Sequence, residues 1–221
     1  MPRTARAIVA GFCYHVINRG NNKAQIFHED ADYAAFIGLM AAAQRKYPLA
    51  LLGACLMPNH IHLVVQPDHD RAVTRWMHWL LTSHVGIHAR KYQTVGRVWQ
   101  GRFKASAIQR DEHLLRVLRY VERNAMRAEL CERAEDWRWG SLNWRSRDPA
   151  VFALQPSPVA LPKDWIRLVN APQTAEELEA IRGSINRQRP IGSKSWIKCA
   201  AQALEMESSI TESGRPIRRN R

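Results

Sequence analysis

Residues 49–66 carry the sequence LALLGACLMPNHIHLVVQ, which predicts two strands joined by a turn. The run at residues 49–56 is apolar, Met57-Pro58-Asn59 has the composition of a tight turn, and residues 60–66 form a second β-favouring run. Because successive side chains of a strand point to opposite faces, His60 and His62 share one face and the apolar residues Ile61, Leu63 and Val65 share the other. We therefore expect a β-hairpin that carries two imidazoles side by side.

The segments around this hairpin predict an alternation of strands and helices. Residues 14–18 suggest a strand, while residues 30–47 and 71–92 repeat apolar side chains at helical spacing. Residues 98–109 fit a fourth strand broken at Gly101, and Asp111 can cap a further helix. The order β-α-β-β-α-β plus one helix matches the ferredoxin-like split βαβ arrangement, an α+β fold with an antiparallel sheet and helices on one face. Beyond residue 148, only residues 174–187 predict a helix.

The charge distribution divides the chain near residue 148. Of the 221 residues 46% are hydrophobic, enough for a sizeable core, which excludes disordered and fibrous proteins. The formal charge is +13, with sixteen Lys and Arg against seven Asp and Glu at residues 71–147, and nine against three at residues 182–221. An acidic, proline-bearing stretch separates these basic regions. We expect a folded domain at residues 1–147, then a connector, a short helix and a basic tail at residues 148–221, with nucleic acid as the partner.

Several other classes of protein are excluded. No stretch approaches the roughly 18 apolar residues that span a bilayer, and the N-terminal residues lack the pattern of a signal peptide. Cys13, Cys55, Cys131 and Cys199 show no paired spacing, which argues against a disulfide framework and a thiolate zinc site. We expect a protein of the reducing cytoplasm.

A tyrosine on the helix after the fourth strand lies beside the predicted basic face. Tyr120 and Asn124 are four residues apart, so they are neighbours on one side of this helix. They lie at the border between an apolar stripe and a basic face. The stripe is formed by Leu114, Leu118 and Val121, and the basic face by Arg116, Arg123 and Arg127. A tyrosine in such a place is ordinarily a half-buried packing residue. The neighbouring amide, the arginines and the His pair in the same domain favour a functional role here.

Together these side chains suit the cleavage of a phosphodiester. A tyrosine hydroxyl has a pKa of about 10 and needs help to act as a nucleophile near neutral pH. A divalent ion held by His60, His62 and Asn124 would polarise the scissile phosphate, while arginines neutralise the flanking phosphates. Attack by Tyr120 would leave a phosphotyrosine bond, which conserves the phosphoester so that a strand can be rejoined.

Two motifs stand out, MPNHIHLVV at residues 57–65 and YVERN at residues 120–124. They are accompanied by NRGN at residues 18–21, QGRFK at residues 100–104 and WRWGS at residues 137–141. In this order they resemble the single-tyrosine HUH transposases, in particular the REP-associated tyrosine transposases of bacteria, over residues 10–145. The stretches RPIG at residues 189–192, Trp196, and GRP at residues 214–216 resemble the REP-associated subgroup.

The resemblance implies a ferredoxin-like catalytic domain at residues 1–147, in which Tyr120 attacks single-stranded DNA. It implies a Mg²⁺ or Mn²⁺ ion bound by His60, His62 and Asn124, and recognition of palindromic repeats that fold as hairpins, by a monomer or a homodimer. The family usually has Asn-Pro-Val-Arg-Ala where this chain has NAMRA at residues 124–128. Because proline would stop the helix, Ala125 permits a further helical turn.

Further residues are candidates for contacts with DNA. Those near the active face and in the loop after the first strand are Asn18, Arg19, Arg102, Lys104, Arg116 and Arg123, and Arg215 lies in the extended tail. Trp99 and Phe103 could stack on unpaired bases or belong to the core. His84 and His88 are four residues apart with no glutamate between them, and we assign them to surface or DNA-facing positions.

Two other functions stay open on the sequence. A regulator that binds hairpin DNA without cutting it would show binding with a steep salt dependence and no strand transfer. A hydrolytic metallonuclease would use water as the nucleophile and would accumulate no covalent adduct.

Overall fold

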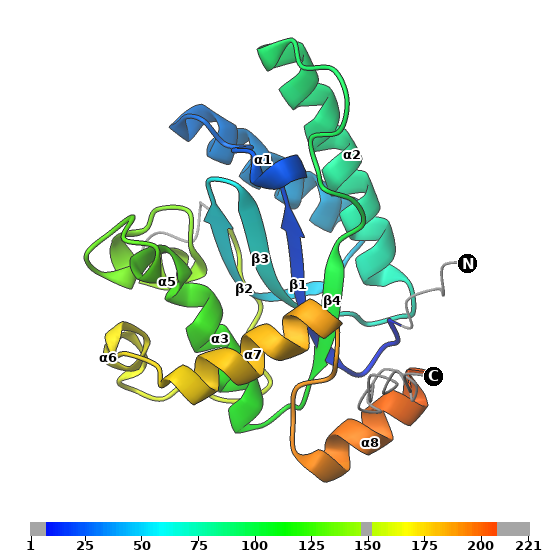
Figure 1. Cartoon of the computed structure of the whole chain (residues 1–221), viewed down its shortest axis with the longest axis vertical. Coiled ribbons are helices and arrows are strands. Elements are labelled where there is room, and N and C mark those ends of the chain that lie inside the picture. The colour runs from blue at the N-terminus through cyan, green and yellow to red at the C-terminus, as the bar shows by residue number, and fades with distance from the viewer. Residues whose placement is uncertain (1–7, 147–151, 207–221) are drawn as a thin grey trace, which may run out of the picture.

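A sheet of four antiparallel strands forms the middle of the molecule (Figure 1). The structure is a computed structural model, and it describes residues 8–146 and 152–206. The strands are β1 (Cys13–Arg19), β2 (Ala50–Met57), β3 (His60–Gln66) and β4 (Lys104–Ile108), in the order β2-β3-β1-β4. Helix α1 (Asp30–Lys46) connects β1 to β2, and α2 (Ala72–Tyr92) connects β3 to β4. The ferredoxin-like arrangement is confirmed.

The hairpin of β2 and β3 forms as its sequence predicts, with the turn at Pro58 and Asn59. Strand β3 also pairs with β1, with Ile17 opposite His62 and Arg19 opposite His60. The alternation along β3 holds in three dimensions, because Ile61, Leu63 and Val65 are buried in the core that includes α1 and α2. The two histidines therefore face the other side of the sheet.

Helices cover both faces of the sheet, so the expectation that they would cover one face is wrong. Helix α3 (Glu112–Glu122) packs on β2 and β3 from the side opposite α1 and α2. The reason is a second apolar surface, formed by Leu52, Cys55 and Val64 on the strands, against which α3 places Leu114 and Leu118. Asp111 caps α3 by accepting a hydrogen bond from the backbone N–H of His113, at 2.9 Å.

The fourth strand is shorter than expected, since only residues 104–108 belong to β4 and residues 98–103 form a loop. Gly101 has a φ of 158°, which interrupts the strand in the way that glycine permits. The loop is held against the end of β1 by two backbone hydrogen bonds of 2.8 Å, from Asn21 to Val98 and from Gln100 to Arg19. Within it, Trp99 and Phe103 are each 6% exposed, which places both in the core rather than on the surface.

The C-terminal part of the chain has more helices than the sequence predicts. A four-residue helix, α4 (Asn124–Arg127), continues α3 by the further turn that Ala125 permits, and α5 (Ser141–Ser146) follows the 3₁₀ turn η2 (Ala134–Asp136). Helix α7 (Ala175–Arg187) was expected, with Thr174 and Glu177 forming its capping box. Helices α6 (Trp165–Asn170) and α8 (Lys194–Ala203) were not, because α6 is too short to show a period and α8 has few large apolar residues.

Segments from this C-terminal part cover both edges of the sheet. At the β4 edge, Ile191 forms a parallel bridge with Ile108 and exchanges backbone hydrogen bonds of 2.8 Å with Ala107 and Gln109. At the β2 edge, the backbone N–H of Gln155 donates to the carbonyl of Leu51, at 2.9 Å. Covered edges leave few strand groups free to pair with another chain.

A cluster of histidines lies between α1 and α2, which corrects the assignment of His84 and His88 to the surface. They are 4% and 7% exposed, and His84 packs edge to face against Phe27 and Phe36. Helix α2 turns them inward with its apolar side, together with Trp76 and Leu80. Burial lowers the pKa of His84 to about 4, so this imidazole is neutral at physiological pH.

Among the residues described, no helix combines the length and apolarity that a membrane span requires.

The buried His84 predicts a loss of stability in acid. Its pKa is about 4 in the folded protein and 6.5 in the unfolded chain, so the unfolded chain binds more protons between these values and stability falls as the pH is lowered through this window. At pH 5 this residue alone should cost about 2 kcal/mol. Urea unfolding of His84→Phe at pH 7 and pH 5 should therefore show a smaller acid loss than the wild type.

The exposed His78 on the same helix provides the control, and His78→Phe should keep the full acid loss. An unchanged pH dependence in His84→Phe would contradict the assignment of a neutral, buried imidazole at this position.

Candidate active site

The two histidines of β3 are held with their rings side by side. The ring centroids of His60 and His62 are 4.9 Å apart, at 77° to each other. His60 Nδ1 lies 2.6 Å from the side-chain oxygen of Asn59, in the hairpin turn. Burial lowers the pKa of His60 to about 4 and that of His62 well below its usual range, and nearby arginines act in the same direction. Both imidazoles are therefore neutral, the form that binds a metal ion.

A third histidine, which the sequence reasoning did not single out, completes this group. His15 on β1 lies beside His62, with 5.1 Å between ring centroids and 7° between ring planes, so that the two rings are nearly parallel. Its Nε2 lies 2.9 Å from His62 Nδ1. His15 is diagonal to His62 in the ladder, because Ile17 is the residue opposite His62. The alternation of β1 could have placed His15 on the histidine face once the register with β3 was known.

Tyr120 lies in the last turn of α3, over the histidines. Its ring centroid is 5.8 Å from that of His62 and 6.1 Å from that of His15, and both pairs meet edge to face. The guanidinium of Arg127, from α4, lies over the Tyr120 ring at 4.3 Å from its centroid. The tyrosine is thus enclosed between imidazoles and a cation.

Asn124 begins α4 and lies one turn after Tyr120. Its amide oxygen accepts a hydrogen bond of 2.9 Å from Arg127. Its amide nitrogen is buried and has no hydrogen-bond partner in the structure. A carbonyl oxygen has two lone pairs, so this amide oxygen can keep its contact with Arg127 and still bind a cation.

The side chains of His60, His62, Tyr120 and Asn124 line a single cavity of about 440 Å³. The structure therefore brings together Tyr120, His60, His62 and Asn124, from β3, α3 and α4. The remaining walls add positive charge, and some of them come from the C-terminal part of the chain. These walls are formed by Ile17, Arg19, Arg127, Ala128, Arg182, Ile185 and Asn186. Arg127 is one of the arginines expected beside Tyr120, and the helix places it next to Asn124. Arg182 was not a candidate for this site on the sequence, because only tertiary contacts bring it here.

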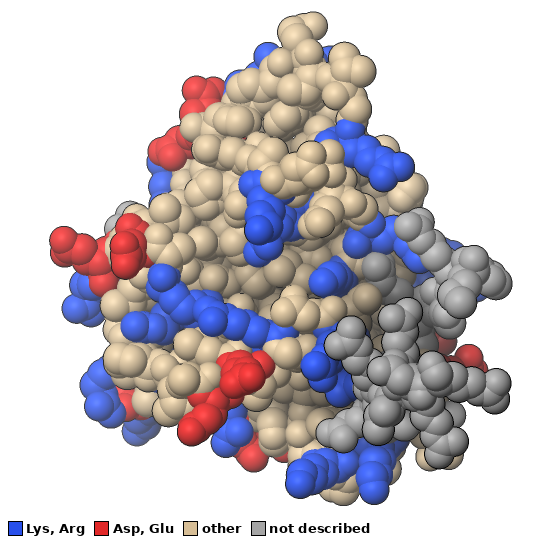
Figure 2. Space-filling view, viewed as in Figure 1, with Lys and Arg blue, Asp and Glu red and all other residues tan. Residues whose placement is uncertain are grey.

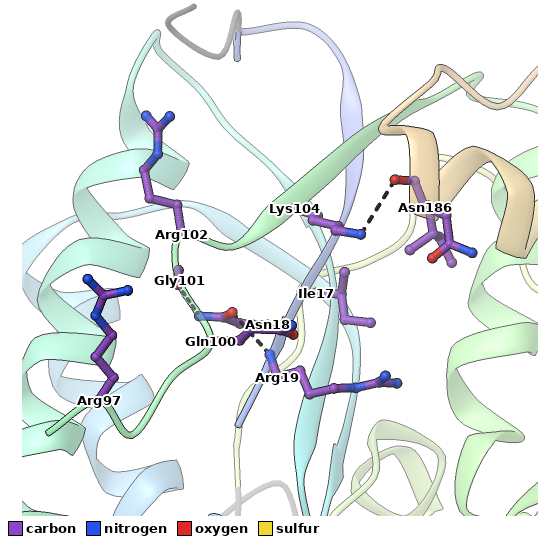
Figure 3. A pocket seen from close by; sticks show the side chains of 10 residues that line it. Ile17, Asn18, Arg19, Arg97, Gln100, Gly101, Arg102, Lys104 and Asn186 are labelled. Atoms are coloured by element: carbon purple, nitrogen blue, oxygen red, sulfur yellow. Dashed lines mark hydrogen bonds between the residues drawn. The ribbon is translucent and has the colours of Figure 1, made fainter. Parts of the chain in front are cut away.

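A second cavity of about 680 Å³ adjoins the first, with which it shares Ile17, Arg19, Ile185 and Asn186 (Figure 3). Its basic side chains are Arg19, Arg97, Arg102 and Lys104. Asn18 lines it too, but is 5% exposed and donates from its amide to the carbonyl of Gly101, at 3.3 Å. Figure 2 shows Lys and Arg side chains gathered across the middle of this face, over β4 and α7. We call these two adjoining cavities together the basic groove.

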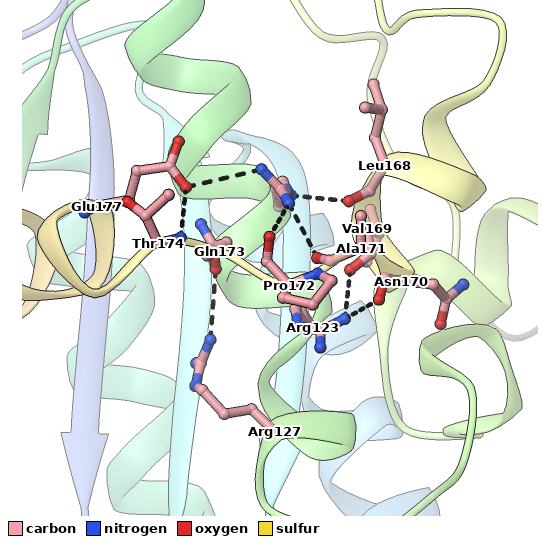
Figure 4. A network of polar contacts seen from close by, with 11 residues as sticks. Arg123, Arg127, Leu168, Val169, Asn170, Ala171, Pro172, Gln173, Thr174 and Glu177 are labelled. Carbon is pink, nitrogen blue, oxygen red and sulfur yellow. Dashed lines mark hydrogen bonds and ion pairs between the residues drawn. The ribbon is translucent and has the colours of Figure 1, made fainter.

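Other arginines near Tyr120 do not line the groove and instead bind backbone carbonyls of the C-terminal part of the chain (Figure 4). Arg123 donates to the carbonyls of Val169, at 3.1 Å, and Asn170, at the end of α6. Arg119 donates to three further carbonyls, those of Leu168, Ala171 and Pro172, at 2.7, 2.9 and 2.8 Å. Carbonyls at the end of a helix lack partners within the helix, so these arginines fix α6 to α3. Arg116 is exposed on α3, and Arg215 lies outside the described residues.

A buried carboxylate secures the same helix from the other side. Glu122 is 2% exposed and accepts hydrogen bonds from Ser141, Arg145 and Trp165, at 2.6, 2.9 and 2.7 Å. Trp165 begins α6, and Ser141 and Arg145 belong to α5. The helix that presents Tyr120 is thus fixed by charged contacts to two later segments of the chain.

Comparison with known proteins gives this site a context. Residues 8–124, from the start of the described chain to Asn124, match the family described as "Transposase IS200 like". The chain belongs to this family. The family consists of DNA-processing enzymes, and its matched region contains β1 to β4 and all four of the side chains named above.

Two individual proteins extend the comparison. A curated Haemophilus influenzae protein with the provisional name REP-associated tyrosine transposase is 28% identical over 108 residues, which cover 44% of this chain and 61% of that protein. The chain thus spans about three fifths of that relative's length. A solved structure of a REP-associated tyrosine transposase bound to a REP hairpin is 20% identical, with a TM-score of 0.53 over 72% of this chain and 90% of the other. The expected resemblance is confirmed, and the structural likeness confirms the shared fold.

The residues of the cavity fit the divalent ion that the family implies. Asn59 fixes His60 through Nδ1, and His15 engages His62 through Nδ1, so each ring has Nε2 left for a ligand. The amide oxygen of Asn124, which accepts one hydrogen bond from Arg127, has a second lone pair for a cation. Asp111, Glu112 and His113 also lie within reach of one cation, but at the opposite end of α3 from Tyr120, where Asp111 serves as the helix cap.

The buried carboxylate provides a test of how the tyrosine helix is held. Glu122→Ala leaves the half-buried Arg145 without its ion-pair partner, and should lower the free energy of unfolding by about 3–5 kcal/mol in urea titrations. The exposed Glu179 of α7 supplies the control, and Glu179→Ala should change stability by less than about 0.5 kcal/mol. Equal, small effects of the two substitutions would mean that the Glu122 contacts do not stabilise this helix.

Proposed function

We propose that this protein is a metal-dependent endonuclease and strand transferase that acts on single-stranded DNA at hairpin-forming palindromic repeats, through a covalent phosphotyrosine intermediate. The observation that carries the proposal is the single cavity that Tyr120, His60, His62 and Asn124 line, continuous with a basic cavity. Family membership supports a DNA-processing enzyme, and the cavity supplies the groups for one particular chemistry.

Tyr120 is the proposed nucleophile. In the first step its oxygen forms a bond to phosphorus, the bond from phosphorus to a sugar oxygen breaks, the phenolic proton is lost, and the sugar oxygen leaves as a hydroxyl. Arg127, 4.3 Å from the ring centroid, stabilises the negative charge that develops on the phenolic oxygen. Because the phosphotyrosine conserves the phosphoester, a second strand end can reverse the step without an energy cofactor.

His60, His62 and Asn124 are the proposed ligands of a Mg²⁺ or Mn²⁺ ion. When bound, such an ion polarises the scissile phosphate and offsets its negative charge. The protein's own contribution is to hold two neutral imidazoles at 4.9 Å between centroids with Tyr120 next to them. Arg19 and Arg182, on the walls of the cavity, are placed to neutralise the neighbouring phosphates.

The basic groove is the proposed path of the DNA strand. Arg19 borders both cavities, so a strand whose scissile phosphate lies at Tyr120 continues past Arg102, Lys104 and Arg97. Cations in these positions bind the phosphates of the strand without recognising its base sequence. The hairpin bound by the solved relative supports a hairpin as the partner of this chain, taken up by a monomer or a homodimer.

We further propose that residues 1–147 form the catalytic domain and that residues 148–221 complete it. The support lies in α7, whose Arg182, Ile185 and Asn186 line the catalytic cavity. Lys104 contacts the same helix, since its amino group lies 3.4 Å from the carbonyl oxygen of Asn186. In this proposal the basic tail that contains Arg215 adds a separate contact to DNA.

The nucleophile is tested by trapping the covalent adduct. Wild-type protein, a labelled hairpin oligonucleotide with single-stranded flanks and Mn²⁺ should give a protein–DNA band on a denaturing gel. Tyr120→Phe should give none, because the phenyl ring packs as before but has no oxygen to attack phosphorus. Tyr47→Phe, at the end of α1, is the matched control and should form the adduct at the wild-type rate.

The same gel separates the proposal from its alternatives. Product formed by Tyr120→Phe without an adduct would identify a hydrolytic nuclease. Retarded migration of the hairpin in a native gel, with no product from wild type under any divalent ion, would identify a binding protein.

The path of the strand is tested by the salt dependence of binding. Arg102→Ala and Lys104→Ala should each weaken binding to the hairpin oligonucleotide and lower the slope of log K against log salt by about 0.7 to 0.9, the effect of one lost phosphate contact. Arg45→Ala removes the same charge from the exposed end of α1 and should leave the slope unchanged. If all three variants gave equal slopes, the groove would not be the path.

A further inference from the structure

His15 and His62 form a buried pair of imidazoles beneath the catalytic cavity. They are 1% and 2% exposed, and the 7° angle between the ring planes and the 2.9 Å contact from His15 Nε2 to His62 Nδ1 fix their mutual orientation. His15 Nδ1 is buried without a hydrogen-bond partner. An unpartnered polar atom in the middle of a sheet costs free energy, so stability alone does not explain a histidine here.

A hydrogen bond between two neutral imidazoles allows two arrangements. In the first, His62 carries its hydrogen on Nδ1 and donates to His15 Nε2, which leaves a lone pair on His62 Nε2. In the second, His15 donates from Nε2, and His62 carries its hydrogen on Nε2, where it cannot bind a metal ion. The choice between them decides whether His62 can act as a ligand.

The charges around the cavity favour the first arrangement. His62 lines the cavity, whose walls include Arg19, Arg127 and Arg182. With Nδ1 engaged by His15, the nitrogen of His62 left for the cavity is Nε2. A lone pair directed toward three cations is favourable, whereas an N–H directed toward them is not.

The ring of His60 is also oriented by a neighbouring side chain, that of Asn59. Asn59 donates from its amide nitrogen to the carbonyl of Lys23, at 3.1 Å, which leaves its amide oxygen for His60 Nδ1. An amide oxygen can only accept, so His60 must carry its hydrogen on Nδ1. The two proposed ligands are thus oriented by two different neighbours.

We infer that His15 is a positioning residue, which accepts a hydrogen bond from His62 and thereby holds the His62 ring in the form and orientation that bind the metal ion. The inference rests on the proposed function, because it assigns His15 a task only if His62 is a metal ligand. Partners of this kind typically change metal affinity by about 10- to 100-fold when they are removed.

The first experiment measures Mn²⁺ binding by the full chain, from the free Mn²⁺ signal in electron paramagnetic resonance. His15→Phe retains a ring but cannot accept the hydrogen bond, and should weaken Mn²⁺ binding by about 10- to 100-fold. His15→Gln places an amide near the former Nε2 and should recover most of the affinity. His84→Phe, the same substitution at a buried histidine of the other core, should bind as the wild type does. Thermal unfolding establishes that each variant is folded.

The second experiment needs no metal ion and no variant. Long-range ¹H–¹⁵N NMR of the wild-type protein shows which ring nitrogen carries the hydrogen, and should find it on Nδ1 of His62. A hydrogen on Nε2 of His62 would overturn the inference.

The outcomes distinguish a failure of the inference from a failure of the proposed function. Wild-type binding that is lost in His60→Ala but unchanged in His15→Phe overturns the role of His15 and leaves the metal site in place. The absence of Mn²⁺ binding by the wild type overturns the metal site itself, and the role of His15 with it.

Discussion

The pleat of β3 is the constraint on which the rest of the structure depends. Alternate side chains must face opposite sides of the sheet, and β3 gives one side three aliphatic residues and the other two imidazoles. A slip of one residue against β1 would bury His60 and His62 between the sheet and α1, and would expose Ile61 to the polar cavity. The aliphatic core under α1 and α2 thus fixes the register that keeps the histidines under Tyr120.

The positive charge of the chain has two separate uses. Its excess at residues 71–147 indicated a nucleic-acid partner, and Arg97, Arg102 and Lys104 do lie along the basic groove. Arg119, Arg123 and Arg145 instead bind carbonyls and a carboxylate inside the molecule. Equal charges can therefore differ in purpose, because an arginine has enough donors to fix a helix end as well as a phosphate. A count of charges along the sequence cannot separate these uses.

Much of the fold and the grouping of the proposed catalytic residues could be predicted, because both follow from local periodicity. The two-residue period placed His60 beside His62, and the helical period placed Asn124 beside Tyr120. What the sequence did not reveal depends on contacts between distant segments. His15 needs the register of β1 with β3, and Arg182 reaches the cavity only because α7 packs on β4. Short elements such as α6 show no period at all.

The covered edges of the sheet have a consequence for synthesis on the ribosome. Strand β4 ends at residue 108, whereas the segments that protect the edges follow at residues 139–140 and 155 for β2 and at residue 191 for β4. Translation proceeds from the N-terminus at about 5–20 residues per second, so the β4 edge waits roughly 4 to 16 seconds for its cover. During that interval the nascent sheet presents unpaired backbone groups to neighbouring chains. A nascent chain of this protein is therefore most vulnerable to aggregation after its sheet is complete and before residue 191 emerges.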